Sequence, residues 1–375
     1  MSGPARFGKN RILDVLASDI VATIISIVIT LLIGIVIGLV ILVISSPAQG
    51  WSAFTTLITG GFIMNGALSS IGNMIYFAVP IILIGLSFGF AFKAGVFNIG
   101  TPGQFTIGAV SAISIAIWFE SSLGSGVWIL ALIVASVLGG IWSAISAFLK
   151  TAFNVNVIIS GIMLNYIAVN SLNWFIKSRP ELYESGLNWT MEIPAAAVIP
   201  RLGMDQVFDG KPVNIGIFIA VIAALLIWFV LRKTTIGFEM RAAGSNPDAA
   251  GYAGINVKKT ALFSMFISGM LSALGGALYF LTSTGTHYWL TEAIRPEGFT
   301  GIAVALLGLL HPIGAILAGF LISFLQVGGQ NMQAFGIQSE IATVITAVMI
   351  FACSISFWFK ILWIKAIKKI GRRKT

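Results

Sequence analysis

Charged residues are scarce in this sequence of 375 residues. Asp, Glu, Lys and Arg make up 9% of it, hydrophobic residues make up 57%, and the mean hydropathy is +0.98. A water-soluble surface needs a much larger share of charged residues. The composition therefore excludes a soluble globular protein and predicts a protein embedded in a lipid bilayer.

Residues that bind metals or act as nucleophiles are also few. The sequence has one cysteine, Cys353, and two histidines, His287 and His311. These cannot assemble a metal site, and neither an H-E-x-x-H motif nor a paired-cysteine spacing occurs. No Ser/His/Asp or Cys/His set is visible either. We therefore expect no catalytic residue and no metal ligand on this chain, which makes an integral membrane enzyme the weakest reading.

A phosphate-binding loop is missing as well. The motif G-x-x-x-x-G-K-[ST] does not occur, and the two Gly-Lys pairs of the sequence are followed by Asn10 and Pro212 instead of Ser or Thr. We therefore expect no cofactor on this chain, and any step driven by ATP and Mg²⁺ must take place on a partner.

Long apolar runs, in contrast, fill the sequence. A helix that crosses a bilayer needs about 20 apolar residues. Eight runs meet or approach this length: Ile20–Ile44, Asn73–Phe92, Val96–Phe119, Val127–Leu149, Val155–Ile176, Ile215–Leu231, Ala261–Thr282 and Ile341–Phe359. A ninth run, Gly298–Gln330, is too long for one span and is interrupted by His311-Pro312, so we expect two short or partly re-entrant helices there. The sequence predicts an all-α membrane protein with about ten transmembrane helices, forming one transmembrane domain over residues 1–375.

The basic residues predict the orientation, because Lys and Arg flank spans on the cytoplasmic side. With the N-terminus inside, most of the 22 basic residues fall in cytoplasmic segments. This arrangement places residues 1–19, the loop 232–259 and the basic tail 360–375 in the cytoplasm, and the loop 177–213 outside. Both termini are then cytoplasmic. We expect the tail to contact anionic membrane lipid, and we expect no nucleic-acid partner.

Two short segments of the sequence resemble each other. "PGQFTIGAV" (Pro102–Val110) and "PEGFTGIAV" (Pro296–Val304) share Pro, Phe, Thr, Ala and Val at matching offsets. In the topology above they run in opposite directions, as inverted repeats do. Helices interrupted by Gly and Pro in corresponding positions of two halves point to a transport site near the membrane midplane. The echo therefore nominates Asn98–Gln104 and Glu297–Gly301, although a biased composition also produces such matches by chance.

A polar insert, "RAAGSNPDAAGYAGINVKK" (Arg241–Lys259), separates two apolar runs. Ser245 or Asn246 can cap a helix, Pro247 suits its first position, and Gly254 can end it. The resulting helix of about two turns is too short to be stable alone. A short helix at the membrane surface suits a groove on a soluble partner; the alternative is an ordinary connecting loop. The residues that we expect at such a contact are Arg241, Asn246, Pro247, Asp248, Tyr252 and Gly254.

Three segments carry a resemblance to a known family: "TTIGFEMRAAGSNPDAAGYAGINVKKTALFSMFISGMLSALGGALYF", "AGVFNIGTPGQFTIGA" and "GFTGIAVALLGLLHPIGAILAGF". From about Ile71 to Phe351, the chain resembles the permease subunits of bacterial ABC importers of the simple-sugar and nucleoside branch. The resemblance implies that residues Asn246–Ile255 form the coupling helix that receives the motion of an ABC ATPase subunit. It also implies a second, identical or homologous permease chain, an extracellular or periplasmic substrate-binding protein or lipoprotein, and a location in the bacterial cytoplasmic membrane.

Within that branch, "FNIG" followed by "GQ" is more similar to nucleoside permeases than to ribose-type permeases, so a simple-sugar (ribose- or galactose-type) permease is the alternative. One departure is that Pro102 stands where the family usually has Glu. An ion-coupled secondary transporter is a more distant alternative, because it usually needs an ionisable relay within the membrane, and we expect all 13 acids at helix ends or in loops.

A path for nucleosides needs amides for hydrogen bonds and aromatic rings for stacking in an otherwise apolar lining. An interhelical hydrogen bond or a lipid-facing ring is the alternative role for each such residue. Our candidates for the substrate pathway are Asn98, Gln104, Asn165, Asn170, Asn173, Trp174 and Phe299.

Overall fold

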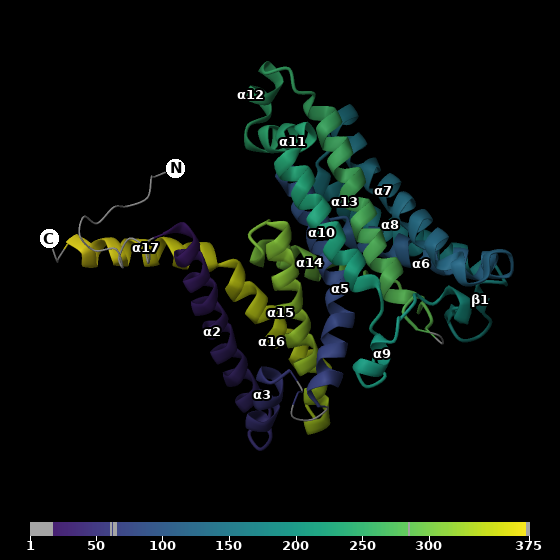
Figure 1. Cartoon of the computed structure of the whole chain (residues 1–375), viewed down its shortest axis with the longest axis horizontal. Coiled ribbons are helices and arrows are strands. Elements are labelled where there is room, and N and C mark those ends of the chain that lie inside the picture. The colour runs from purple at the N-terminus through teal and green to yellow at the C-terminus, as the bar shows by residue number, and fades with distance from the viewer. Residues whose placement is uncertain (1–17, 61, 63–65, 284–285, 373–375) are drawn as a thin grey trace. The chain divides into compact units, whose positions relative to one another are not determined.

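Helices dominate the chain. The computed structural model describes residues 18–60, 62, 66–283 and 286–372 (Figure 1). These residues belong to two compact units, Asn65–Phe324 and Met1–Met64 with Leu325–Thr375, which we describe separately. The predicted all-α membrane fold is confirmed. A single permease domain over residues 1–375 stays a prediction.

The larger unit consists of long helices joined by short connections. Its helices are α5 (Ala67–Lys93), α6 (Thr101–Leu123), α7 (Val127–Phe153), α8 (Val157–Lys177), α9 (Met204–Val207), α10 (Gly216–Lys233), α11 (Thr235–Ser245), α12 (Pro247–Tyr252), α13 (Val257–Phe280), α14 (Glu297–Leu307) and the first part of α15 (Pro312–Asn331). Two 3-10 turns, η1 (Gly124–Gly126) and η2 (Ala195–Ala197), and a hairpin of β1 (Tyr183–Glu184) and β2 (Trp189–Thr190) complete it. Helices α11 and α12 lie at one end of this unit and α9 lies at the other (Figure 1).

Helix α13 lies at the centre of the larger unit and packs against α5, α6 and α7. Small residues make these contacts close. A Cβ atom at Gly108 would overlap the backbone of Ala273, and one at Gly276 would overlap the backbone of Phe105. Gly139 and Gly269 face each other in the same way. Small residues allow such backbone approach in membranes, where dispersion contacts and hydrogen bonds drive helix association.

The smaller unit contains α2 (Asp19–Ser45), α3 (Gly50–Ile58), η3 (Met332–Phe335), α16 (Ser339–Ser354) and α17 (Ser356–Arg372). Helix α2 packs against α16 and α17. The prediction of one span over Ile341–Phe359 is wrong, because a turn at Ile355 separates α16 from α17. The serines on both sides of this residue are weak helix formers, which allows the break. Of the predicted cytoplasmic segment 1–19, residues 1–17 lie outside the described residues.

The apolar runs of the sequence correspond well to the helices. Over the described residues, seven stretches are long and apolar enough to span a membrane; one of them, Thr101–Phe153, contains both α6 and α7. Helix α14 is shorter but apolar. The predicted division of the run Gly298–Gln330 is confirmed, since α14 ends at Leu307 and α15 begins at Pro312. The prediction of a helix from Val96 is wrong at its start, because α6 begins at Thr101.

Candidate functional site: a broken helix and a surface helix

The chain interrupts its helices between α5 and α6. Helix α5 ends at Lys93, residues 94–100 are not helical, and α6 begins at Thr101. In this break, Asn98 donates a hydrogen bond to Ser268, near the middle of α13, with 2.7 Å between Nδ2 and Oγ. The break therefore lies deep between helices. Irregular backbone at such a depth is tolerated only where protein surrounds it or where it lines a cavity.

Two candidate pathway residues, Asn98 and Gln104, bind each other across the break. Asn98 Nδ2 lies 3.0 Å from Gln104 Oε1, and Gln104 Nε2 lies 3.1 Å from Asn98 Oδ1. Asn98 Oδ1 also accepts a hydrogen bond from the Gly100 N–H at 3.0 Å. Asn98 is 0% exposed and Gln104 is 2% exposed. In this conformation each amide is satisfied by protein groups, and the pair fixes the shape of the break.

A third candidate, Asn165 on α8, holds the break from the other side. Its Oδ1 accepts from the Gly103 N–H at 2.9 Å, and its Nδ2 donates to the Ile99 carbonyl at 3.0 Å. Asn165 is buried. The first N–H groups of a helix have no partner within the helix. Asn165 binds one of these, the Gly103 N–H, and also the Ile99 carbonyl just before the helix. The structure thus brings Asn98, Gln104 and Asn165 together around one segment.

The starts of α6 and α14 meet at this place. Thr101 Oγ1 donates to the Gly298 carbonyl at 2.9 Å, and Ser272 Oγ on α13 donates to the Thr101 carbonyl at 2.8 Å. A Cβ atom at Gly298 would overlap Pro102. The two segments singled out by their similar sequences are therefore in contact, although they are almost 200 positions apart. Pro102 lies within this contact, at the position where the resemblance leads one to expect Glu.

The other four candidate pathway residues are exposed or bond to other groups. Asn170 is exposed and donates to a carbonyl of its own helix, and Trp174 is 72% exposed. Asn173 Nδ2 donates to the Thr291 carbonyl at 2.9 Å. Phe299, in the first turn of α14, is 39% exposed. Their place in a substrate pathway stays a prediction.

A polar cluster beside the start of α14 joins Glu297, which lies in a nominated segment, to Tyr288 and Arg295, which the sequence reasoning missed. The guanidinium of Arg295 lies 4.5 Å from the centre of the Tyr288 ring and 5.3 Å from that of Phe280. Tyr288 is fully buried, and this burial raises the pKa of its hydroxyl. In the part of the chain that is described, Arg295 Nε and Glu297 Oε2 are buried without a hydrogen-bond partner. Such atoms are costly unless a further group completes them.

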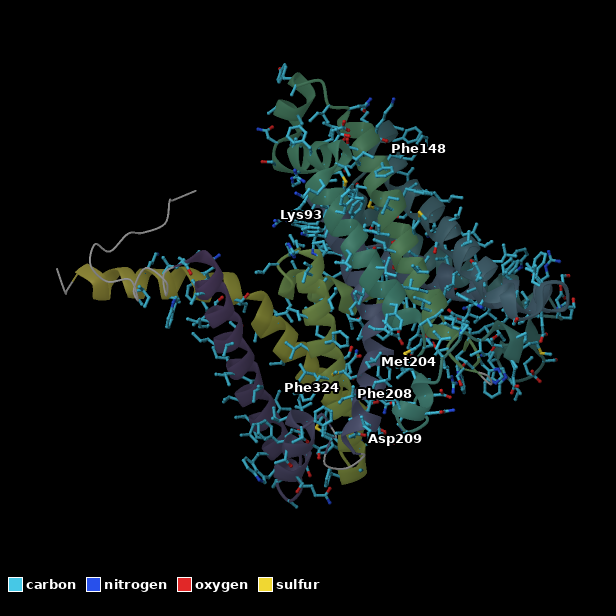
Figure 2. All side chains as sticks on the ribbon, viewed as in Figure 1. Lys93, Phe148, Met204, Phe208, Asp209 and Phe324 are labelled. Carbon is cyan, nitrogen blue, oxygen red and sulfur yellow. The ribbon has the colours of Figure 1, made fainter. Side chains whose placement is uncertain are left out.

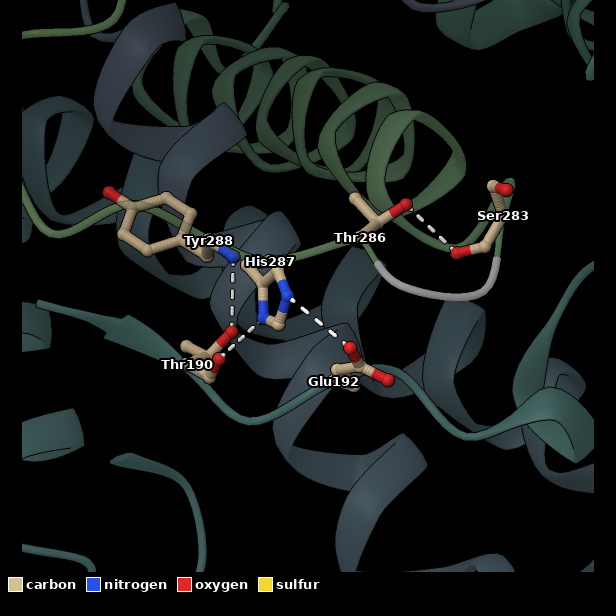
Figure 3. Close-up of polar contacts among 6 residues, drawn as sticks. All are labelled: Thr190, Glu192, Ser283, Thr286, His287 and Tyr288. Carbon is tan, nitrogen blue, oxygen red and sulfur yellow. Dashed lines mark hydrogen bonds and ion pairs between the residues drawn. The ribbon is translucent and has the colours of Figure 1, made fainter. Parts of the chain in front are cut away.

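The loop that carries this cluster is fastened to the β1–β2 hairpin (Figure 3). The Tyr288 N–H donates to Thr190 Oγ1 at 3.0 Å, and His287 Nδ1 donates to the Thr190 carbonyl at 2.9 Å. His287 Nε2 lies 3.7 Å from a Glu192 carboxylate oxygen. The loop 177–213 is therefore a folded part of the site's surroundings, and its hairpin was not predicted from the sequence.

The polar insert forms the short helix that the sequence predicts. Asn246 caps α12, since its Oδ1 accepts from the N–H groups of Asp248 at 3.1 Å and Ala249 at 3.0 Å. Gly254 follows the helix in a left-handed conformation, with φ +84°. Tyr252 is 96% exposed. Helix α11, which precedes α12 and carries Arg241, was not predicted.

The described residues contain no group of three or more His, Cys, Asp and Glu that could hold a metal ion. Amides, hydroxyl groups and one Arg–aromatic cluster surround the two helix starts. Such groups can bind or position a polar solute.

Comparisons with known proteins identify the family. Residues 70–354 match the family described as branched-chain amino acid transport system / permease component. The guanosine ABC transporter permease protein NupP of Bacillus subtilis is 36% identical over 335 residues, which cover 88% of this chain and 92% of NupP. The nucleoside ABC transporter permease protein NupB of Lactococcus lactis is 36% identical over 304 residues, covering 80% and 83% of the two chains. The glucose ABC transporter permease protein TsgB13 of Haloferax volcanii is 32% identical over 291 residues, covering 76% and 75%. No solved structure matches the chain.

Proposed function

Since this chain belongs to the family of branched-chain-amino-acid-type transport permeases, we propose that it is the membrane-spanning permease subunit of an ATP-driven ABC importer of nucleosides. The observation that carries the proposal is the 36% identity to guanosine and nucleoside permeases over most of the chain. The buried amide network around a broken helix agrees with a polar, uncharged solute. A sugar importer is the second candidate, supported by the 32% identity to a glucose permease.

In this proposal the chain hydrolyses no ATP and works with partners. An ABC ATPase subunit docks on α12, whose exposed Tyr252 and capped N-terminus suit a groove. A second permease chain, identical or homologous, completes the membrane part; in support, B. subtilis has the two relatives NupP and NupQ, and L. lactis has NupB and NupC. A substrate-binding protein or lipoprotein delivers the nucleoside from outside the bacterial cytoplasmic membrane. Closure and release of the ATPase pair would expose the path alternately to the two sides.

We place the substrate path beside the two helix starts. Asn98 and Gln104 offer amide donors and acceptors that match those of a base edge, and a nucleoside at the break would exchange their mutual hydrogen bonds for its own. The rings of Tyr76 and Tyr279 stack with centres 5.5 Å apart and provide a flat aromatic surface near Glu297. Nucleosides suit such a path because they present both a polar edge and a stacking face.

Uptake in cells with and without the gene tests the substrate. Labelled guanosine, uridine and adenosine should enter only when the gene is present, and a large excess of ribose or glucose should leave this uptake unchanged. Loss of glucose or ribose uptake on deletion, with nucleoside uptake unaffected, would favour the sugar importer and overturn the nucleoside assignment.

A pair of substitutions on α12 tests the coupling role separately. Asp248→Lys with Tyr252→Lys should abolish uptake and the recovery of the ATPase subunit with the purified permease, while the permease stays in the membrane at its normal level. Both residues are exposed, so folding of the chain should be unaffected. Retained uptake would remove α12 from the contact with the ATPase.

A further inference from the structure

A cavity of about 360 Å³ lies at the end of the larger unit that carries α11 and α12. Figure 2 shows Lys93 at this end and Asp209 at the opposite one. The cavity lies between the last turns of α5 and α10, one side of α11 and the turn between α14 and α15. Its walls are formed by Lys93, Trp228, Leu231, Arg232, Arg241, Leu309, Leu310, His311 and Pro312.

Three cationic side chains from three different helices converge on this cavity. They are Lys93, Arg232 and Arg241, and no Asp or Glu lines the cavity with them. Over the described residues none of the three forms an ion pair with an acid or donates a hydrogen bond to a helix carbonyl. Lys93 is half-buried, whereas Arg232 and Arg241 are exposed at the mouth of the cavity. Like charges that lie close together repel each other, and no acid lines the cavity to offset this repulsion.

Helix ends offset only a part of this charge. Lys93 and Arg232 are in the last turns of α5 and α10, where the helix dipole is negative. Arg241 lies within α11, away from such an end. Burial lowers the pKa of His311, and the positive charges of Arg232 and Lys93 lower it further. The positive field of these two side chains therefore extends to His311 at the cavity wall.

The turn that forms one wall has an unusual backbone. Leu309 and Leu310 are both left-handed, with φ of +56° and +55°, a conformation that is costly for residues with a side chain. Gly308 and Gly314 pack so closely that a Cβ atom on either would overlap the other's backbone. This packing holds His311 and the two leucines at the cavity. Backbone of this kind often lies where a ligand binds.

We propose that this cavity is a binding site for a phosphate-bearing anion. Two guanidinium groups and one ammonium group supply directed donors and three positive charges, which suit phosphate oxygens. Trp228 and the leucines supply an apolar wall for the group that the phosphate carries. The headgroup of an acidic phospholipid and a soluble phosphate compound share this chemistry. The site does not depend on the identity of the transported solute.

Two binding measurements on the purified full-length chain distinguish these sources. The first is equilibrium dialysis of radiolabelled inorganic phosphate against the chain in phosphatidylcholine nanodiscs. The second counts, by mass spectrometry, the phosphatidylglycerol molecules retained after exchange with vesicles of phosphatidylcholine and phosphatidylglycerol. We expect about one saturable anion per chain in at least one measurement. Binding in the first measurement alone would indicate a soluble phosphate compound. Binding in the second measurement alone would indicate a lipid.

A charge-matched pair of variants locates the site. Lys93→Gln, Arg232→Gln and Arg241→Gln together should weaken binding at least tenfold. A control variant removes the same charge from exposed positions outside the cavity and should change binding less than twofold. It carries the substitutions Lys233→Gln, Lys258→Gln and Lys259→Gln. If the cavity variant does not elute as a folded species, Arg241→Gln alone replaces it, since Arg241 is exposed. Equal losses in cavity and control variants, or no saturable binding in either measurement, would overturn the proposal.

Discussion

Replacing Asn165 tests whether one buried amide stabilises the break between α5 and α6. Asn165→Ala removes the acceptor of the Gly103 N–H and the donor to the Ile99 carbonyl, at 2.9 and 3.0 Å. A buried polar group without a partner costs about 1–3 kcal/mol, so two give about 2–6 kcal/mol. Side-chain hydrogen bonds between membrane helices average about 0.6 kcal/mol, so two lost bonds give a lower bound of about 1 kcal/mol. We expect the loss of unfolding free energy to exceed this bound, because no hydrogen bond within a helix can replace those of the Gly103 N–H and the Ile99 carbonyl.

The free energy of unfolding of the purified chain, measured by titrating SDS into mixed micelles, provides the assay. Asn170→Ala is the matched control, because Asn170 is five residues further along the same helix, is exposed and bonds only to a carbonyl of that helix. It should stay within about 0.5 kcal/mol of the native chain. If both variants unfold at the same SDS fraction, the reasoning that Asn165 holds the break is refuted.

Three further predictions concern packing, capping and pH. Gly108→Ala should destabilise the chain by more than about 1 kcal/mol, because the new methyl group would overlap the Ala273 backbone, whereas Gly126→Ala, with open space around it, should be neutral in the same SDS titration. Asn246→Ala removes the cap of α12 and should cost that helix about 1 kcal/mol; we expect reduced recovery of the ATPase subunit, and Asn246→Ser should restore it. Because the pKa of His311 is lowered in the folded chain, the unfolded state binds more protons at acid pH. Thermal stability should therefore fall as the pH drops below about 6.5, and His311→Gln should flatten that dependence between pH 7.5 and 5.

Helix positions could be predicted well from the sequence because a bilayer imposes a simple rule on them. Apolar length alone located α2, α5, α7 and α13, and the capping residues located α12. The rule fails where a helix ends inside the membrane, since polar partners decide that boundary. The start of α6 at Thr101 depends on Asn165 and Ser272, which are remote in the sequence and visible only in the folded chain.

The candidate site was predictable in part. The similar segments at Pro102 and Pro296 lie at two helix starts that meet, and the polar residues within the break were named; their role as a transport site stays a prediction. Tyr288 and Arg295 were missed because loop residues carry no periodicity to indicate burial, whereas their neighbour Glu297 lay in a nominated segment. The hairpin contact with Thr190, which buries this loop, joins positions almost 100 residues apart.

The close packing around α13 has a mechanical consequence. Helix α12 ends at Tyr252 and α13 begins at Val257, and Ser268 of α13 lies about 17 Å along that helix, at a rise of 1.5 Å per residue. The interlocked backbones at Gly108 and Gly276 leave α13 no room to slide against α6. We therefore expect that a displacement of α12, passed on by the short connection to α13, reaches the break as a rigid-body movement of α13. The turns between the helices, rather than the helices themselves, have to bend for this unit to change shape.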